Sequence, residues 1–212
     1  MSGQVNHVQH PLVEHHLVRL RDEATPPEEF RRLIGRLAVL LAYEATQDLR
    51  LGDVLVRTPL VETHGKTLTQ RIGLVPILRA GLGMVDPILN LIPSAEVWHV
   101  GLYRDEETAR PVEYYSKIPR ETPFDVALIV DPMLATGGSA TLAIETMRNR
   151  DVPAVKLLSV IASQAGIQAV TDQHPEIQIY VCAIDPTLND QKFIVPGLGD
   201  AGDRTFNTPP RE

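Results

Sequence analysis

The sequence predicts an α/β protein in which a parallel sheet carries helices on both faces. Short apolar runs of strand length alternate with stretches of helix length from about residue 54 to residue 183. One of these runs, Ile72–Leu78, is almost continuously apolar, as expected of a strand that is buried on both faces. Neither an internal repeat nor a linker interrupts the pattern, so we expect residues 1–212 to form a single domain.

The expected elements begin with a helical N-terminal part, residues 1–50. A short amphipathic helix covers residues 10–20, and a longer helix begins at Thr25-Pro26-Pro27-Glu28 and ends near Gln47. Thr25 is predicted to cap the second helix, since proline suits the first helical position and Glu28 completes a capping box. Strands are expected at 54–57, 72–78, 96–103, 126–130, 154–162 and 177–183. Helices are expected at 81–91, 139–150 and 166–173, and a polar, flexible loop or β-excursion at 104–120.

Composition limits the classes of partner. The formal net charge is −7, which makes the chain a poor bulk binder of nucleic acid or of an anionic membrane. The single cysteine, Cys182, cannot form an internal disulfide and fits a reducing compartment. No apolar run has the length of a transmembrane helix, and the first residues lack the pattern of a secretory signal. We therefore expect a cytoplasmic protein that binds neither nucleic acid nor membrane.

The most informative stretch covers residues 126–139. An apolar strand leads into Asp131, then into Thr136-Gly137-Gly138-Ser139, and then into a helix. Glycines let backbone N–H groups approach an anion, and a helix N-terminus adds unpaired donors and partial positive charge. The spacing is neither that of a Walker A loop nor that of a dinucleotide fingerprint. By itself it fits a phosphate cradle and an ordinary capped helix equally well.

The segment Asp131-Pro132-Met133-Leu134-Ala135-Thr136-Gly137-Gly138-Ser139 resembles the substrate loop of type I phosphoribosyltransferases, in the form found in uracil phosphoribosyltransferases. Segments that begin at Val75, Tyr103 and Ile194 match the same family in order. They read Val-Pro-Ile-Leu-Arg-Ala-Gly-Leu-Gly-Met, Tyr-Arg-Asp-Glu-Glu-Thr and Ile-Val-Pro-Gly-Leu-Gly-Asp-Ala-Gly-Asp. The resemblance covers nearly the whole chain. It implies that uracil and 5-phosphoribosyl-1-diphosphate (PRPP) are converted to UMP and diphosphate in pyrimidine salvage.

The resemblance also implies roles for individual residues. Arg79, Arg104, Asp131 and Asp200 would be the catalytic residues, and all four would contact PRPP. The remaining PRPP-binding residues would be Pro132, Met133, Leu134, Ala135, Thr136, Gly137, Gly138 and Ser139. Uracil would be held by Ile194, Gly199, Asp200 and Ala201, mainly through their backbone. Many type I phosphoribosyltransferases carry a second acidic residue where this chain has Pro132, and proline is the form found in the uracil family.

Further expectations concern the cofactor and partners. The resemblance implies Mg²⁺ as the cofactor, bound mainly through PRPP and water, so no set of protein metal ligands is expected. The segment after Arg104 resembles the hood that covers PRPP in this fold, which predicts a lid at 104–120. The family forms homodimers or larger homo-oligomers, and GTP activates some members. One alternative function is that of another enzyme of the same fold, which uses a purine or orotate. A second is a regulator of the same fold that senses a nucleotide and binds RNA, which would need a basic face.

Overall fold

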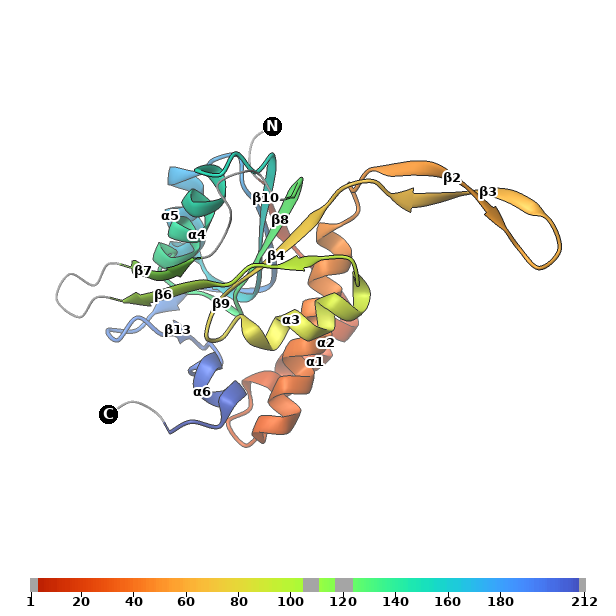
Figure 1. The fold of residues 1–212 in the computed structure, drawn as a ribbon. Coiled ribbons are helices and arrows are strands. Elements are labelled where there is room, and N and C mark those ends of the chain that lie inside the picture. The colour runs from red at the N-terminus through yellow and green to blue at the C-terminus, as the bar shows by residue number, and fades with distance from the viewer. Residues whose placement is uncertain (1–3, 105–110, 117–123, 210–212) are drawn as a thin grey trace.

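The computed structural model describes residues 4–104, 111–116 and 124–209. The strands are β1 (Val5–His7), β2 (Leu51–Arg57), β3 (Glu62–Leu68), β4 (Ile72–Leu78), β5 (Glu96–Val97), β6 (Val100–Arg104), β7 (Pro111–Ser116), β8 (Val126–Val130), β9 (Met133–Leu134), β10 (Ala154–Ser163), β11 (Gln178–Asp185), β12 (Thr187–Leu188) and β13 (Ile194–Val195). The helices are α1 (Pro11–Arg21), α2 (Pro27–Ala45), α3 (Leu82–Leu91), α4 (Gly138–Arg148), α5 (Gln164–Gln173) and α6 (Ala201–Phe206). Figure 1 shows the arrangement.

The central sheet has the order β1-β11-β10-β8-β4-β6-β7, and β5 and β9 pair with β4 and β10. Every pairing is parallel except that of β6 with β7. The prediction of an α/β fold with a mostly parallel sheet is therefore confirmed. Strand β8 lies at the centre, and each of its residues is buried. The turns that follow the parallel strands consequently meet at one edge of the sheet, where ligands bind in such folds.

Helices cover both faces of the sheet (Figure 1). One core layer packs α1, α2 and α3 against the face that carries Leu128 and Leu158. The other layer packs α4 and α5 against the face that carries Ile129 and Leu157. Adjacent residues of one strand thus serve opposite layers, because side chains alternate along a strand. This double burial explains the nearly continuous apolar runs in the sequence.

The N-terminal boundary of α2 differs from the prediction. Pro26, not Thr25, occupies the cap position, and within the described residues its helix start has no side-chain cap. The Thr25 hydroxyl instead donates a hydrogen bond to the carbonyl of Arg19 at 2.5 Å. Thr25 therefore joins the α1–α2 connection to the end of α1, and the prediction of a capping box was wrong.

Several strands were not foreseen: the expected strands do not include β1, β3, β9, β12 and β13. The expected strand at 54–57 is the second half of β2, which pairs along its whole length with β3 to form an isolated hairpin. Figure 1 shows this hairpin extending away from the body. Strand β3 was missed because its residues are polar and none is buried. Within the loop or β-excursion expected at 104–120, residues 111–116 form β7, which agrees with the β-excursion, whereas residues 105–110 and 117–120 lie outside the described residues.

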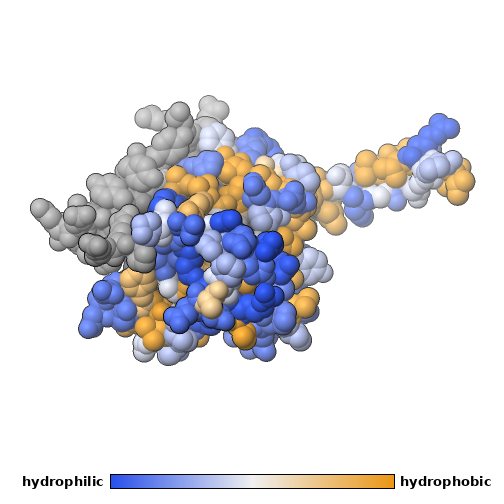
Figure 2. Space-filling view, turned by 90° about the horizontal axis from the view of Figure 1, so that it is seen from below, coloured by the Kyte–Doolittle hydropathy of each residue, from blue (hydrophilic) through white to orange (hydrophobic). Residues whose placement is uncertain are grey.

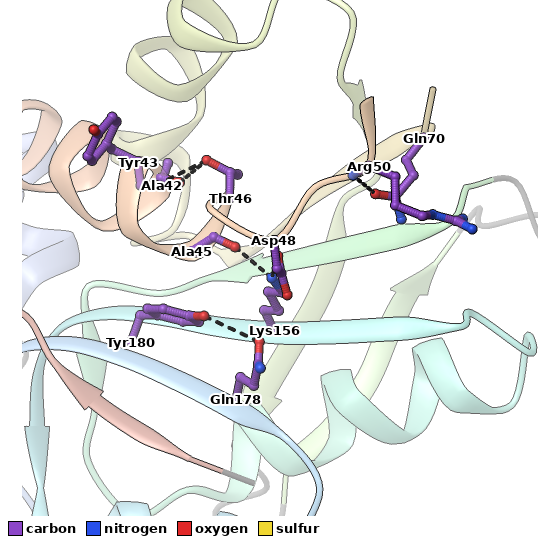
Figure 3. A network of polar contacts seen from close by, with 10 residues as sticks. All are labelled: Ala42, Tyr43, Ala45, Thr46, Asp48, Arg50, Gln70, Lys156, Gln178 and Tyr180. Carbon is purple, nitrogen blue, oxygen red and sulfur yellow. Dashed lines mark hydrogen bonds and ion pairs between the residues drawn. The ribbon is translucent and has the colours of Figure 1, made fainter. Parts of the chain in front are cut away.

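A buried lysine joins α2 to the sheet at the amino ends of β10 and β11 (Figure 3). Lys156 is 4% exposed, and its Nζ donates to the carbonyl of Ala45 at 2.7 Å and pairs with Asp48. A buried charge without partners would destabilise the fold, so these two contacts are needed to keep the ammonium group inside. This polar network lies at the opposite end of the strands from the turn after β8. Among the described residues, no helix is long and apolar enough to cross a bilayer.

Candidate active site

The turn between β8 and α4 is anchored to β10 by backbone hydrogen bonds. Asp131 N donates to the carbonyl of Leu158 at 3.2 Å, and Ile161 N donates to the carbonyl of Pro132 at 3.0 Å. After this anchor, Met133 and Leu134 continue as β9 beside β10. Asp131 is therefore held where the central strand leaves the sheet, and the loop from 131 to 139 rises over the sheet edge.

The residue before α4 is a glycine with a left-handed backbone conformation. Gly137 has a φ of +83°, and a Cβ there would lie 2.9 Å from the carbonyl oxygen of Gly166. Within the described residues no side chain caps α4, so the first N–H groups of this 11-residue helix face outward. The end of β10 supports the loop, because the hydroxyl of Ser163, the residue that also caps α5, donates to the carbonyl of Ala135 at 2.6 Å. These features favour the cradle over the ordinary capped helix.

The loop encloses a cavity of about 80 Å³. Its lining residues are Asp131, Met133, Leu134, Ala135, Thr136, Gly137, Gly138, Ser139, Ala140 and Ser159. Ser159 comes from β10, is fully buried, and its hydroxyl finds no hydrogen-bond partner within the described chain. Buried hydroxyls usually have a partner, so this group is available to a ligand or water in the cavity. Sequence reasoning missed Ser159, since a serine within an apolar strand has no distinguishing local signal.

The Asp131 carboxyl has an unusual electrostatic environment. Burial, together with the negative charge of nearby Asp200, raises the pKa of Asp131 from 3.8 to about 7. A hydrogen bond from Met133 N at 3.2 Å opposes this rise. The structure therefore brings Asp131 and Asp200 close enough for their charges to interact, although they are 69 positions apart in the sequence. A carboxyl with such a pKa at a cleft is a typical feature of a functional site.

Arg79 follows β4 and faces the C-terminal segment. The Leu78–Arg79 peptide bond is cis, and Arg79 Nη2 pairs with Asp203 Oδ1 at 3.0 Å. Asp200 caps α6 by accepting a hydrogen bond from Asp203 N at 2.8 Å. A Cβ placed on Gly202 would lie 3.1 Å from Asp200 Oδ1 and 3.7 Å from Arg79 Nη2. Arg79 and Asp200 thus lie on the same side of this short segment.

The segment expected to hold the base contains two residues with buried side chains. Ile194 and Ala201 are 6% and 0% exposed, and both side chains belong to the hydrophobic core. Gly199 has a φ of +75°, which favours glycine. A cavity of about 780 Å³ borders Gly199 and Asp200 and is also lined by Phe193. Backbone groups are therefore the polar groups that Ile194 and Ala201 can offer a ligand.

Comparisons with known proteins identify the family. The model of the uracil phosphoribosyltransferase family matches residues 7–208. The chain belongs to this family. The uracil phosphoribosyltransferase of Roseiflexus sp. strain RS-1 is 54% identical over 206 residues, covering 97% of this chain and 99% of that protein. The uracil phosphoribosyltransferase of Geobacillus kaustophilus is 49% identical over 207 residues, with the same coverage.

Solved structures agree with the fold. A protein from Aquifex aeolicus superposes with a TM-score of 0.92 at 34% identity, covering 98% of this chain and 100% of that one. A hypoxanthine phosphoribosyltransferase from Staphylococcus aureus has a TM-score of 0.51 at 14% identity, covering 73% and 74% of the two chains, which is a likeness of fold alone. The fold is that of the type I phosphoribosyltransferases.

Several of the site residues predicted from the sequence lie close together in this member of the uracil phosphoribosyltransferase family. Asp131, Asp200 and Arg79 converge at the sheet edge, and the loop from Pro132 to Ser139 borders them. Arg104 ends β6, the strand next to β4, but its side chain lies outside the described residues. Asp203 was left aside by the sequence interpretation and is the partner of Arg79. That pairing joins positions 124 apart, so local pattern could not reveal it.

The raised pKa of Asp131 predicts a pH-dependent cost to stability. Between about pH 4 and 7 the unfolded chain releases this proton before the folded protein does, so the free energy of unfolding falls as pH rises. Asp131→Asn removes this titration. We expect the stability advantage of Asp131→Asn over the unsubstituted protein to grow from pH 5 to pH 8 in urea unfolding without ligand. Asp53→Asn, on the exposed hairpin, is the control. An advantage that stays constant or shrinks with pH would contradict the assignment.

Proposed function

We propose that this chain transfers the phosphoribosyl group of PRPP to uracil and forms UMP and diphosphate. The supporting observation is the convergence of an open phosphate cradle, Asp131, Asp200 and Arg79 at one sheet edge in a member of the uracil phosphoribosyltransferase family. The relatives named above carry the name of this activity. The remaining steps follow from the chemistry of the substrates.

The 5′-phosphate of PRPP binds at the start of α4. Outward N–H groups between Thr136 and Ser139 donate to its oxygens, and the helix dipole favours the negative charge. The hydroxyls of Thr136 and Ser139 add two donors of adjustable direction. With its phosphate fixed there, the ribose extends toward Asp131, whose ionised carboxylate accepts hydrogen bonds from the ribose hydroxyls. This arrangement orients the anomeric carbon.

The transfer breaks the bond between the anomeric carbon and the diphosphate oxygen. Uracil N1 forms the new bond to that carbon, the electron pair of the broken bond leaves with diphosphate, and the proton of N1 passes to the departing diphosphate or to water. The protein therefore needs to align N1 with the anomeric carbon and to stabilise the departing negative charge. Arg79 is suited to the second task, because its side chain is half exposed while Asp203 holds its fork in position. We assign the same task to Arg104 at the end of the neighbouring strand.

Mg²⁺ fits the donor set of this edge. Asp131 and Asp200 present carboxylate oxygens, the ligand type that Mg²⁺ prefers. Burial is the main cause of the raised pKa of Asp131, and a cation would offset the further contribution from the charge of Asp200. Among the described residues, no group of three or more His, Cys, Asp or Glu side chains forms a metal cage. We therefore place Mg²⁺ on PRPP and water, beside these two carboxylates. When bound, it supplies neutralisation of the diphosphate charge.

Uracil is read by backbone groups in this proposal. Ile194 and the residues Gly199 to Ala201 lie around the position for the ring. The side chains of Ile194 and Ala201 are buried and Gly199 has none, so N–H and C=O groups are the polar contacts that these three residues offer. The alternative of an RNA-binding regulator has no observation in its favour, since the net charge is −7 and the cradle is open.

We assign the protein to the cytoplasm, where its buried, free Cys182 would stay reduced. Activation by GTP stays a prediction.

The hairpin β2–β3 supports a homodimer or larger homo-oligomer. Its exposed apolar side chains include Leu55, Val56, Leu60 and Val61, at 59%, 42%, 95% and 65% exposure. Figure 2 shows hydrophobic surface on an arm that projects from the body. An isolated two-stranded hairpin is at best marginally stable in water. A second copy related by two-fold symmetry would cover both arms at once.

The proposed function predicts that Arg79→Ala loses transition-state stabilisation. We expect kcat/KM for UMP formation to fall by about 10²-fold or more, by analogy with removal of one electrostatic donor. Arg71→Ala is the matched control: Arg71 precedes β4 as Arg79 follows it, and pairs with Glu96 at 2.6 Å at the other end of the strand. The measurement is UMP formation from uracil and PRPP with Mg²⁺. Equal kinetics in the two variants would refute the role of Arg79.

The hairpin proposal predicts that charges on the arm separate the subunits. We expect the double variant Leu60→Asp, Val61→Asp to sediment as a monomer at micromolar concentration, whereas the unsubstituted protein sediments as a dimer or larger assembly. Val18→Asp on α1 is the control, since Val18 is 72% exposed but lies outside the hairpin. A double variant with the mass of the unsubstituted protein would show that the arm is not the contact.

A further inference from the structure

The turn between β13 and α6, residues 196–200, is called the base turn below. Its second residue, Gly197, has a φ of +61°, and a Cβ there would lie 2.0 Å from the carbonyl oxygen of Ile194. Side chains from outside the turn bind both polar groups of this residue. Gly197 N donates to Asp185 Oδ2 at 3.0 Å, and its carbonyl accepts from Arg21 Nη1 at 2.7 Å. The base turn is thus fixed on both sides of one residue.

Arg21 and Asp185 also bind each other. Nη1 of Arg21 donates to Asp185 Oδ2 at 2.8 Å, and Nη2 donates to Oδ1 at 2.7 Å, which is a bidentate pair. Asp185 is 5% exposed and ends β11, whereas Arg21 is the last residue of α1. A partly buried bidentate pair is directional and resists rearrangement. The pair therefore holds the base turn in a fixed position relative to β11 and α1.

A second arginine clamps the same turn from the other side. Nη1 of Arg204 donates to the carbonyls of Leu198 and Leu20, each at 2.8 Å, and its Nη2 donates to the carbonyl of Asp22 at 2.5 Å. Its guanidinium lies 4.4 Å from the ring centroid of Phe30 on α2. The N-terminal helices thus hold the base turn through residues 20–22 and Phe30, which were not predicted to contribute to the site.

We propose that Arg21 is a positioning residue for recognition of the base, acting through Gly197 on the backbone of residues 199–201. This inference rests on the base position in the proposed function. Backbone groups can discriminate between bases only if their directions are fixed, and the Arg21–Asp185 pair fixes the turn that carries them. Arg21 itself touches neither the base nor PRPP in this arrangement. Its loss should therefore affect use of uracil more than use of PRPP.

Arg21→Lys tests this role. Lysine keeps the charge but lacks the planar fork, so it cannot hold both oxygens of Asp185 and the Gly197 carbonyl together. We expect the KM for uracil to rise about 10- to 100-fold, as for a small misplacement of a binding group, while the KM for PRPP changes by less than about threefold. Asp185→Asn should give the same split, because it keeps an oxygen for Gly197 N but weakens the pair.

Lys156→Gln is the matched control. It removes another buried charge with an ionic partner, at the opposite end of the strands, so it should lower the melting temperature without changing the KM for uracil. A merely structural role for Arg21 predicts the same result for Arg21→Lys, with kinetics per folded molecule unchanged, and that result would overturn the proposal. Equal rises in both KM values would overturn it too.

Gly199→Val distinguishes a failure of the role of Arg21 from a failure of the proposed base position. Valine is strained at a φ of +75°, so the variant should raise the KM for uracil if the base lies at this turn. If Gly199→Val raises that KM and Arg21→Lys does not, the base position holds and the role of Arg21 is refuted. If neither variant changes it, the base position is wrong and the role of Arg21 is refuted with it.

Discussion

The parallel pairing of β8 between β4 and β10 is the constraint on which the site depends. Val130 at the end of β8 lies in register with Pro76 on one side and Leu158 on the other. Because neighbouring strands lie only about 4.8 Å apart, the chain segments that leave β4 and β8 emerge side by side. Arg79 and Asp131 are carried on these segments. The apolar layers on both faces of the sheet, which hold the strands in register, therefore determine where these polar groups lie at its edge.

The sequence predicted the elements whose signal is local. Ile72–Leu78 and Val126–Val130 were identified because burial on both faces leaves a continuous apolar run. The turn after β8 was expected from its pair of glycines before a helix, and Gly137 does adopt a left-handed backbone there. Its binding of phosphate stays a prediction. Strand β3 was missed because it pairs only with its neighbour and buries no side chain, so the apolar pattern of a strand is absent.

The partners of the site residues could not be predicted in this way. Arg79 with Asp203, and Arg21 with Asp185, join positions 124 and 164 apart, and only the folded sheet brings them together. The same limitation applies to Asp131, whose raised pKa depends on burial and on Asp200. In an acidic chain, binding of a substrate that carries both a phosphate and a diphosphate group thus relies on a few oriented groups, at some cost in stability of the free protein.

Discrimination between bases tests most directly whether fixed backbone groups read uracil. Cytosine presents an amino donor in place of the C4 carbonyl and an acceptor in place of N3–H, so at fixed groups it would leave donors facing donors. The measurement is competition between uracil and cytosine at fixed PRPP and Mg²⁺, with UMP and CMP as products. Recognition by fixed backbone groups predicts a kcat/KM for uracil that is about 10⁴-fold higher or more. Comparable kcat/KM values for the two bases would contradict it.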